Sequence, residues 1–204
     1  MKETMVLDQI NNEPNVLGIL YCQHILDSPN VIQEISDFKI NIKTGYELEC
    51  YLKHNAIIDE HNNLSKTYFV KDCVTNEVVG YFSLRTGMVS VNEKKTLFFH
   101  STFDTYPAIE LANFAVNDIY KENHPDVNYL GEIIFKNFIL PLIQYLSKYV
   151  GINILMIYAL PQPKLINFYE SLGFYRLPKK TERQIHNIMK PTYDQNCIFM
   201  FQKI

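Results

Sequence analysis

Residues 107–177 restrict the possible fold more than any other part of this 204-residue chain. They begin with a mostly apolar run, residues 107–116, which is short enough to form a strand and is followed by a polar segment. A long amphipathic helix is predicted for residues 131–149, then a β-branched strand for residues 152–160 and a short helix after it. A strand, a crossover helix and a strand in this order form a right-handed parallel pair, whose ligand site lies where the first strand ends. The stretch therefore predicts an α/β protein with a cleft at that point.

Two short motifs lie within this stretch. Residues 162–174 read QPKLINFYESLGF, in which Tyr169 follows a phenylalanine and precedes a Gly-Phe pair. Residues 128–133 read NYLGEI and place Gly131 at the predicted start of the long helix. Both motifs resemble those of the GNAT superfamily of acyl-CoA N-acyltransferases, in which the first delivers a tyrosine to the departing thiolate and the second binds the pyrophosphate of CoA. The chain departs from the family pattern at Gln162 and Leu165, and its second motif keeps one glycine.

The resemblance implies a GNAT-like α/β fold. Such a fold has a mixed central sheet of about six to seven strands, flanked by helices, with a parallel splayed pair at the acyl-CoA cleft. Residues 52–84 are also similar to the toxin-like branch of the family, where a helix leads into a strand, a turn and a second strand. The length allows one sizeable core, so a single domain over residues 1–204 is expected, with residues 1–44 its least defined part.

Outside the central stretch, the sequence predicts further elements. Residues 31–40 are a candidate first strand, and residues 16–26 suit either a short helix or a strand. A helix is predicted near residues 46–59, and an antiparallel hairpin is predicted from strands 66–74 and 78–86. Residues 87–106 are expected to form a polar connection with a candidate strand at 96–101. The basic run around residues 176–190 is expected to be a solvated loop, and residues 197–204 a closing edge strand.

Two side chains are candidates for proton transfer. The resemblance implies that Tyr169 protonates the leaving thiolate, because a phenol with a pKa of ~10 is neutral beside a thiol with a pKa of ~8.5. Phe168 would then face the core, although an aromatic pair on a short helix is also ordinary core filler. Glu110 lies in the strand predicted to be covered on both faces, where burial would raise its pKa and make it a base for an ammonium group. It could equally form a structural ion pair, with water chains acting as the base.

The resemblance implies that acetyl-CoA is the cosubstrate and an amine the acceptor. The pantetheine arm would pair with the end of the first strand as an added strand, and the pyrophosphate would meet backbone N–H groups at the helix start. Gly131 would let the backbone approach closely. The residues expected to contact the cofactor are Phe114, Ala115, Val116, Asn128, Leu130, Gly131, Glu132, Ile133 and Gln162.

Composition limits the remaining classes of function. The chain has 19 Lys and Arg against 22 Asp and Glu, and this net charge of -3 argues against a general nucleic-acid binder. A basic cluster, made of Arg176, Lys179, Lys180, Arg183 and Lys190, leaves a tRNA partner open. The histidines and cysteines lack metal-site spacing, so no metal is expected. No export signal or membrane span is expected either, which favours a cytoplasmic protein.

Three functions therefore remain open at the level of the sequence. The first is an N-acetyltransferase that moves an acetyl group from acetyl-CoA to a primary amine by direct attack. The second is a toxin-like acetyltransferase of aminoacyl-tRNA. The third is a non-catalytic acyl-CoA sensor or interaction protein, and any of the three is compatible with a homodimer.

Overall fold

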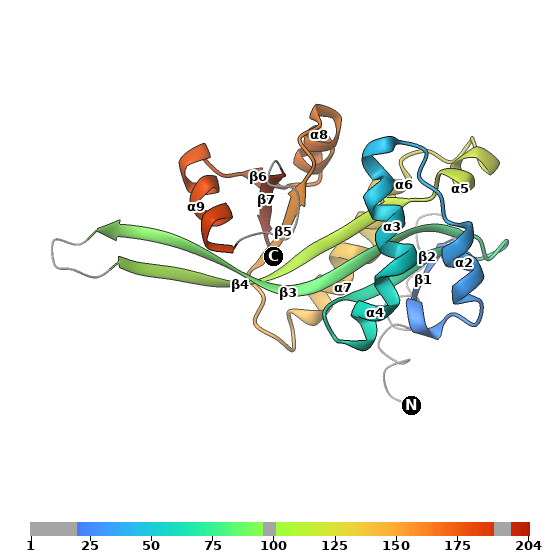
Figure 1. The fold of residues 1–204 in the computed structure, drawn as a ribbon, viewed down its shortest axis with the longest axis horizontal. Helices are drawn as coiled ribbons and strands as arrows, with labels where there is room; N and C mark the ends of the chain where they lie inside the picture. Colours follow the sequence, from blue (N-terminus) through green and yellow to red (C-terminus); the bar gives the residue numbers. More distant parts are fainter. Residues whose placement is uncertain (1–19, 96–100, 190–196) are drawn as a thin grey trace. The chain divides into compact units, whose positions relative to one another are not determined.

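The computed structural model describes residues 20–95, 101–189 and 197–204, and a mixed sheet of seven strands is the centre of this described part. The hydrogen-bonded strand order is β1-β2-β3-β4-β5-β7-β6 (Figure 1). Strands β4 and β5 are parallel, whereas β1–β2, β2–β3, β5–β7 and β6–β7 are antiparallel. The predicted mixed sheet with one parallel pair and flanking helices is confirmed. The strands are β1 Leu20–His24, β2 Lys66–Asp72, β3 Val78–Lys95, β4 Ser101–Val116, β5 Ile154–Ala159, β6 Tyr175–Arg176 and β7 Ile198–Lys203.

The chain divides into two compact units. Unit 1 contains Met1–Arg85 and Ala112–Tyr145, and unit 2 contains Thr86–Leu111 and Leu146–Ile204. Both β3 and β4 therefore continue from one unit into the other. A single domain over residues 1–204 remains a prediction.

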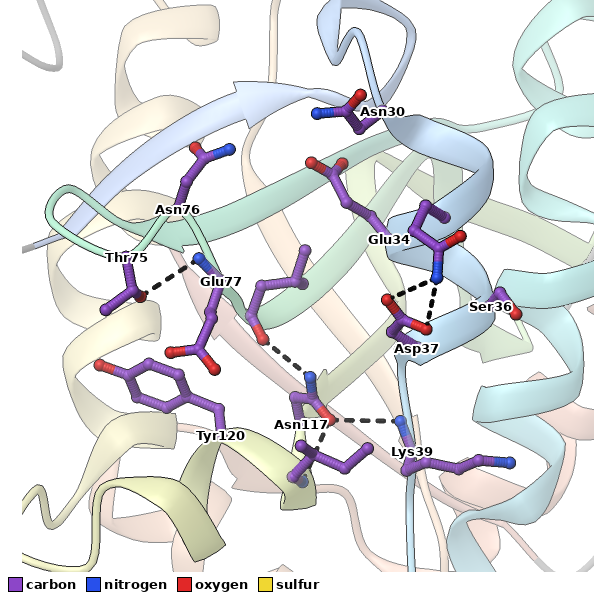
Figure 2. A pocket seen from close by; sticks show the side chains of 13 residues that line it. Asn30, Glu34, Ser36, Asp37, Lys39, Thr75, Asn76, Glu77, Asn117 and Tyr120 are labelled. Carbon is purple, nitrogen blue, oxygen red and sulfur yellow. Dashed lines mark hydrogen bonds between the residues drawn. The ribbon is translucent and has the colours of Figure 1, made fainter.

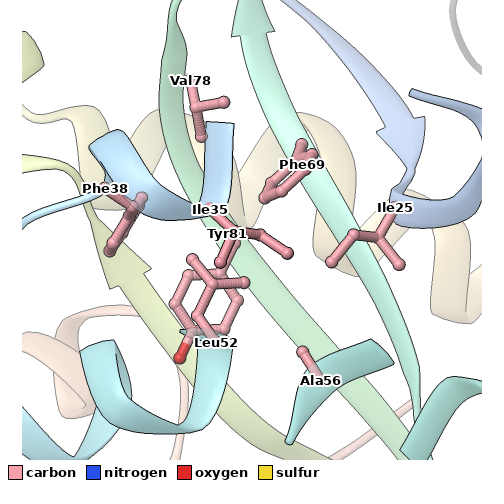
Figure 3. Packing of buried hydrophobic residues seen from close by; sticks show 8 residues of the cluster. All are labelled: Ile25, Ile35, Phe38, Leu52, Ala56, Phe69, Val78 and Tyr81. Carbon is pink, nitrogen blue, oxygen red and sulfur yellow. The ribbon is translucent and has the colours of Figure 1, made fainter. Parts of the chain in front are cut away.

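Helices cover the strands of unit 1. Three of them, α2, α3 and α4, supply side chains to a hydrophobic core with β2 and β3 (Figure 3). Phe38 and Tyr81 meet edge-on in this core with ring centroids 5.3 Å apart, and the Tyr81 hydroxyl donates to the carbonyl of Leu48 at 2.6 Å. The helical segments of this part of the chain are η1 Ile25–Asp27, α2 Val31–Asp37, η2 Lys43–Gly45, α3 Tyr46–His54, α4 Ala56–His61, α5 Asp118–Asn123, α6 Leu130–Ile134, the π-helical η3 Phe135–Ile139 and α7 Leu140–Leu146.

The N-terminal part differs from its prediction in one element. Residues 31–40 were predicted as a strand, but Val31–Asp37 forms helix α2. Ile35 of this helix and Phe38, the C-cap residue directly after it, are both buried, and this spacing of three positions outweighs the β-branched composition. Of the two options for residues 16–26, the strand is correct over Leu20–His24, and residues 16–19 lie outside the described part.

The helix predicted for residues 46–59 forms as two segments. The break between α3 and α4 lies at Asn55, whose φ of -116° and ψ of -31° depart from regular helix. The hairpin predicted after it is confirmed, since β2 and β3 pair antiparallel from Lys66 opposite Leu84 onward.

The predicted long helix begins at Leu130 and ends at Leu146, three residues before its predicted end. Its middle, Phe135–Ile139, is π-helical and ends two residues before Pro141. Pro141 cannot donate a backbone hydrogen bond and its ring crowds the preceding turn, which is a physical reason for a wider turn at this place. Ile134, Phe138 and Leu142 are buried at helical spacing, as expected for an amphipathic helix, whereas Tyr149 lies beyond the helix and is exposed.

Unit 2 contains the parallel pair and two helices, α8 Pro163–Ser171 and α9 Lys179–Met189. Its core joins Val89, Ile154, Ile185 and Phe199 from four different elements. Two predictions about the strands of this unit were wrong. Residues 87–106 are not a polar connection, because 87–95 continue β3 and 101–106 continue β4, while 96–100 lie outside the described residues. The C-terminal strand β7 is not an edge strand either, since β6 pairs with its outer side.

The basic run predicted as solvated loop forms α9 over Lys179–Met189. Glu182 and Ile185 are buried three positions apart, and the Glu182 carboxylate accepts a hydrogen bond from the Phe199 N–H at 3.1 Å. This amphipathic pattern was present in the sequence, but the charged residues around it concealed the helical period.

No helix within the described residues is both long enough and apolar enough to cross a membrane.

Candidate functional site

The end of β4 contains three of the predicted cofactor-binding residues. Phe114, Ala115 and Val116 are half-buried in unit 1. A Cβ atom at Gly80 of β3 would lie 2.7 Å from the Ala115 carbonyl oxygen and 2.8 Å from Cδ1 of Ile134 in α6. Both distances are too short for a real contact, so glycine at this position lets β3 approach the end of β4 and α6 closely.

Pairing between β4 and β5 covers only a short length. Within the described residues, Ala108, Ile109 and Glu110 pair with Ile154, Leu155 and Met156. The last six residues of β4 follow this register without a β5 partner in the described part of the chain. The parallel pair that the GNAT resemblance implied is therefore present, and its splayed shape stays a prediction.

Asn117 directly follows β4, and the sequence analysis overlooked it because it opens a polar segment. Its side chain is buried and bonded on both sides. The amide nitrogen Nδ2 donates to the Val78 carbonyl at 2.9 Å, and Oδ1 accepts from the N–H groups of Lys39 and Ile119, each at 3.2 Å. The backbone N–H of Asn117 donates to the Val79 carbonyl at 2.8 Å. An Asn at the junction of a strand and a polar segment is a typical N-cap, and this was the signal available in the sequence.

The predicted phosphate turn lies at the start of α6. Tyr129 precedes this helix in the left-handed region, with φ of 59° and ψ of 25°, and is 79% exposed. The Ile133 N–H donates to the Tyr129 carbonyl at 2.9 Å, so the set of N–H groups predicted for pyrophosphate is reduced to Leu130, Gly131 and Glu132. Glu132 lies 2.6 Å from Lys136 in an exposed ion pair, which partly neutralises a carboxylate that would oppose a phosphate.

The polar segment before this turn contains the unpredicted helix α5. The Tyr120 hydroxyl donates to Asp72 at 2.8 Å, and burial raises the pKa of this phenol above its ordinary value, as does the Asp72 carboxylate. His124 Nε2 lies 2.8 Å from Glu77, and this hydrogen bond lowers the pKa of the Glu77 carboxyl below its ordinary value. These contacts attach α5 to the turn between β2 and β3.

A polar pocket opens between α2, this turn and α5 (Figure 2). Its carboxylates already have partners in the protein. Glu34 accepts from the buried Lys71 at 2.7 Å, Asp37 from Gln33 at 2.8 Å, and Glu77 bonds His124. Asn117 lies in the wall of the pocket, and Figure 2 shows its hydrogen bonds.

Tyr169 and Glu110 both lie in unit 2. Tyr169 is in α8 and is 8% exposed, whereas Phe168 is half-buried, so the expectation that Phe168 is the core-facing member of the pair was wrong. Burial raises the pKa of the Tyr169 phenol above its ordinary value. Its ring contacts Phe168 and Phe174 edge-on at 5.3 and 5.5 Å, and its hydroxyl has no hydrogen-bond partner among the described residues.

Glu110 is buried in β4, opposite Met156 of β5. The last cofactor candidate of this unit, Gln162, is the half-buried N-cap residue of α8, and its carbonyl accepts from the N–H of Ile166 at 3.0 Å. Asn128 of unit 1 is exposed, and its amide donates to the Asp126 carbonyl at 3.4 Å. The predicted site residues therefore fall into two groups, with the strand end and phosphate turn in unit 1 and Tyr169, Glu110 and Gln162 in unit 2.

In the described part of the chain, no group of three or more His, Cys, Asp or Glu side chains could hold a metal ion. The basic residues Arg176, Lys179, Lys180 and Arg183 are exposed on or just before α9, and Lys190 lies outside the described residues.

No protein-family model matches the chain, and no curated protein matches it. Solved structures do match it. A tyrosine-to-phenylalanine variant of KacT is 17% identical, with coverage of 91% of this chain and 95% of that chain and a TM-score of 0.63. AtaT complexed with acetyl-methionyl-tRNAfMet is 16% identical, with coverage of 90% and 94% and a TM-score of 0.62. AtaTR bound with AcCoA is also 16% identical, with coverage of 91% and 94% and a TM-score of 0.58. A similar structure of AtaT is described as a toxin. The chain therefore has a GNAT-like fold, similar to that of the AtaT and KacT structures.

Proposed function

We propose that this protein is a GNAT-type N-acetyltransferase that moves an acetyl group from acetyl-CoA to a primary amine by direct attack. The observation that carries the proposal is the similarity, over about nine-tenths of the chain, to a structure bound with AcCoA. The local support is Tyr169, a neutral buried phenol that lies in the motif by which the sequence resembles the family.

The proposed reaction has three steps. Glu110 or a water molecule removes a proton from the ammonium group, because only the neutral amine has the lone pair needed for attack. The amine nitrogen bonds to the thioester carbonyl carbon, and backbone N–H groups near Ala115 stabilise the oxyanion. The carbon–sulfur bond then breaks, and Tyr169 donates its proton to the thiolate, which leaves as free CoA. The new amide nitrogen loses the extra proton that it carried after attack, and this proton restores the phenol of Tyr169.

The proposed cofactor contacts use mainly backbone. Pantetheine would pair as an added strand with Phe114, Ala115 and Val116, and the pyrophosphate would meet the first turn of α6. This turn is formed by Leu130, Gly131, Glu132 and Ile133. The Ile133 N–H already donates to the Tyr129 carbonyl, so the N–H groups of the first three would contact the pyrophosphate. Asn128 and Gln162 are proposed to contact the cofactor with their side chains.

A second candidate acceptor is the α-amino group of an aminoacyl-tRNA. It is favoured by the similarity to AtaT complexed with acetyl-methionyl-tRNAfMet and by the exposed cations of α9. Phosphate contacts by these cations would make the activity fall steeply as salt rises. In the triple variant Lys179→Glu, Lys180→Glu and Arg183→Glu, acetylation of charged tRNA should fall at least about tenfold while acetylation of a small amine is unchanged. Equal activity of this variant and the parent on charged tRNA would remove the tRNA candidate.

The experiment that tests the main proposal measures release of the CoA thiol over a panel of amines, polyamines, peptides and charged tRNA. The variant Tyr169→Phe keeps the ring and its packing but removes the proton, so we expect turnover to fall at least about tenfold with unchanged acetyl-CoA affinity. Phe168→Leu is the matched control for packing on the same helix and should change turnover little. If the parent binds acetyl-CoA but Tyr169→Phe has full activity, the proposed role of the tyrosine is wrong. Binding without turnover of any acceptor would instead favour a non-catalytic acyl-CoA sensor.

A further inference from the structure

Asn117 joins the end of β4 to the start of β3. It directly follows Val116, and its backbone N–H and its Nδ2 donate to two successive carbonyls of β3, those of Val79 at 2.8 Å and Val78 at 2.9 Å. Asn117 is 6% exposed, so these bonds are protected from competing water. The last residues of β4 are therefore held to β3 by a side-chain bond in addition to the backbone pairing.

The same side chain also connects a third segment. Its Oδ1 accepts from the Lys39 N–H at 3.2 Å, and next to it the Asp118 N–H donates to the Lys39 carbonyl at 2.9 Å. Asp118 in turn accepts from the Asn41 N–H at 2.8 Å. The connection between α2 and α3 is thereby fixed beside the point where β4 ends. Oδ1 also accepts from the Ile119 N–H, and this bond caps α5. The amide oxygen therefore bonds Lys39 and Ile119, whereas the amide nitrogen bonds β3.

Close packing makes the position of the strand end sensitive to this amide. The Ala115 carbonyl lies so near Gly80 that a single methyl group there would clash at 2.7 Å. Backbone that is packed this closely on one side and bonded at its end has little freedom to shift. Pairing with an added strand needs backbone groups at fixed spacing and direction, and a preorganised strand end lowers the cost of ordering on binding.

We infer that Asn117 is a positioning residue for CoA. By donating a hydrogen bond to the Val78 carbonyl, Asn117 aligns the backbone of Ala115 and Val116 for pairing with the pantetheine arm. This inference rests on the proposed function. Asn117 itself does not touch the cofactor in this scheme. Its effect is confined to the pantetheine part of the ligand, because the phosphate contacts proposed at Leu130 to Glu132 lie on another element.

The test compares two ligands on two variants. Asn117→Asp and Asn117→Ser both retain an oxygen that can cap α5. The Asp carboxylate has no proton to donate to the Val78 carbonyl, and the Ser hydroxyl, which lies one bond closer to the backbone than the amide nitrogen, is expected to fall short of it. Calorimetry should show CoA binding weakened about tenfold in both variants, whereas adenosine 3′-phosphate 5′-diphosphate, which lacks pantetheine, should bind within about twofold of the parent. Asn123→Ala is the matched control, because it removes another side-chain amide of the same connection, which bonds Glu77 at 3.3 Å. It should leave both affinities unchanged.

The outcomes separate the inference from the proposed function. Equal weakening of both ligands, or no weakening of CoA, would show that Asn117 has a general structural role or none at the cofactor, and the inference would be wrong while the proposed function stands. A parent protein that binds neither ligand would remove both. If Asn117→Asp does not fold because its carboxylate faces the Val78 carbonyl, the uncharged Asn117→Ser carries the comparison.

Discussion

Gln202 of β7 illustrates how a single side chain can reduce the stability of the protein. Among the described residues, its Nε2 is buried without a hydrogen-bond partner. A buried donor without a partner costs roughly 1–3 kcal/mol of folding free energy, because it has lost its bonds to water. Its other amide atom, Oε1, lies 3.6 Å from where a Cβ of Gly173 would be, in the segment that follows α8.

Gln202→Leu should therefore be neutral or should raise the free energy of unfolding by up to about 1 kcal/mol, since an apolar group of similar size needs no partner. Urea unfolding measures this change. Thr67→Val is the opposite case: it removes a hydroxyl bonded to buried Ser83 at 2.9 Å, and should destabilise by about 1 kcal/mol. A loss of more than 1 kcal/mol in Gln202→Leu would mean that the amide has a stabilising role.

Glu49 of α3 is a buried carboxylate that has three hydrogen-bond donors. Lys53 Nζ and Lys39 Nζ donate to its Oε1 at 2.7 and 3.2 Å. The Ile40 N–H donates to its Oε2 at 2.9 Å. Burial favours the neutral carboxyl, but these hydrogen bonds outweigh it and lower the pKa of Glu49 to about 2, from 4.5.

A pKa lowered in the folded state stabilises the protein above the unfolded pKa, and this contribution is lost as the pH falls toward the folded pKa. Glu49 should therefore contribute fully above pH 4.5 and lose its contribution between pH 4.5 and about 2. Glu49→Gln should lower stability at pH 7 by roughly 1–3 kcal/mol and flatten the acid dependence in that window. Glu47→Gln, an exposed position on the same helix, is the control. Parallel acid-unfolding curves for the parent and Glu49→Gln would contradict the assignment.

At the scale of elements, the packing of β3 against β4 and α6 depends on Gly80. Gly80→Ala places a methyl group 2.7 Å from the Ala115 carbonyl, and backbone cannot yield as a flexible side chain can. We expect a loss of roughly 1–3 kcal/mol, as for other overpacked sites, measured by thermal unfolding. The control is Gly151→Ala, which would meet nothing within 4 Å and should be neutral. A neutral Gly80→Ala would show that β4 can move away from β3 without cost.

The same scale shows what the sequence could predict. The β2–β3 hairpin, the β4 and β5 strands and α8 follow from hydrophobic period and turn residues, which act within a few neighbours. Helix α2 was missed because Val31 and Ile40 favour strands, although Ile35 and Phe38 have helical spacing and a core to pack on. Helices α5 and α9 were missed because their charged residues conceal short apolar faces that only tertiary contacts select.

The candidate site shows the limits of prediction more clearly. Tyr169 and Glu110 were predicted from local signals, a motif and a charge within an apolar strand, and their roles stay predictions. Asn117 was missed because its role depends on Val78 and Lys39, which lie far away in the sequence. The phosphate turn has one free N–H group fewer than predicted, because the Ile133 N–H donates to the Tyr129 carbonyl. This difference depends on where the helix begins, and helix boundaries are the least predictable part of a helix.

At the scale of the whole molecule, ligand binding should raise thermal stability. A ligand that binds the folded state at 100 times its Kd stabilises by about 2.7 kcal/mol. For a chain of this size we expect acetyl-CoA to raise Tm by roughly 5–10 °C, as measured by calorimetry. Acetate at the same concentration is the control and should leave Tm unchanged. No change in Tm at millimolar acetyl-CoA would contradict both the enzyme and the sensor.

The passage of β3 and β4 through both units limits how such a protein can evolve. Each unit is assembled from two separate stretches of chain, and two of the three crossings lie in the middle of continuous strands, whereas the third, after Tyr145, lies within α7. Gene recombination that exchanges a contiguous segment cannot transfer either unit intact, because each unit consists of two stretches of chain. Separating the units requires cuts within β3 and β4. We expect that changes in acceptor choice arise in such a chain by point substitution and loop extension, and that chimaeras joined at residues 85 or 111 fail to fold unless both strands come from the same parent.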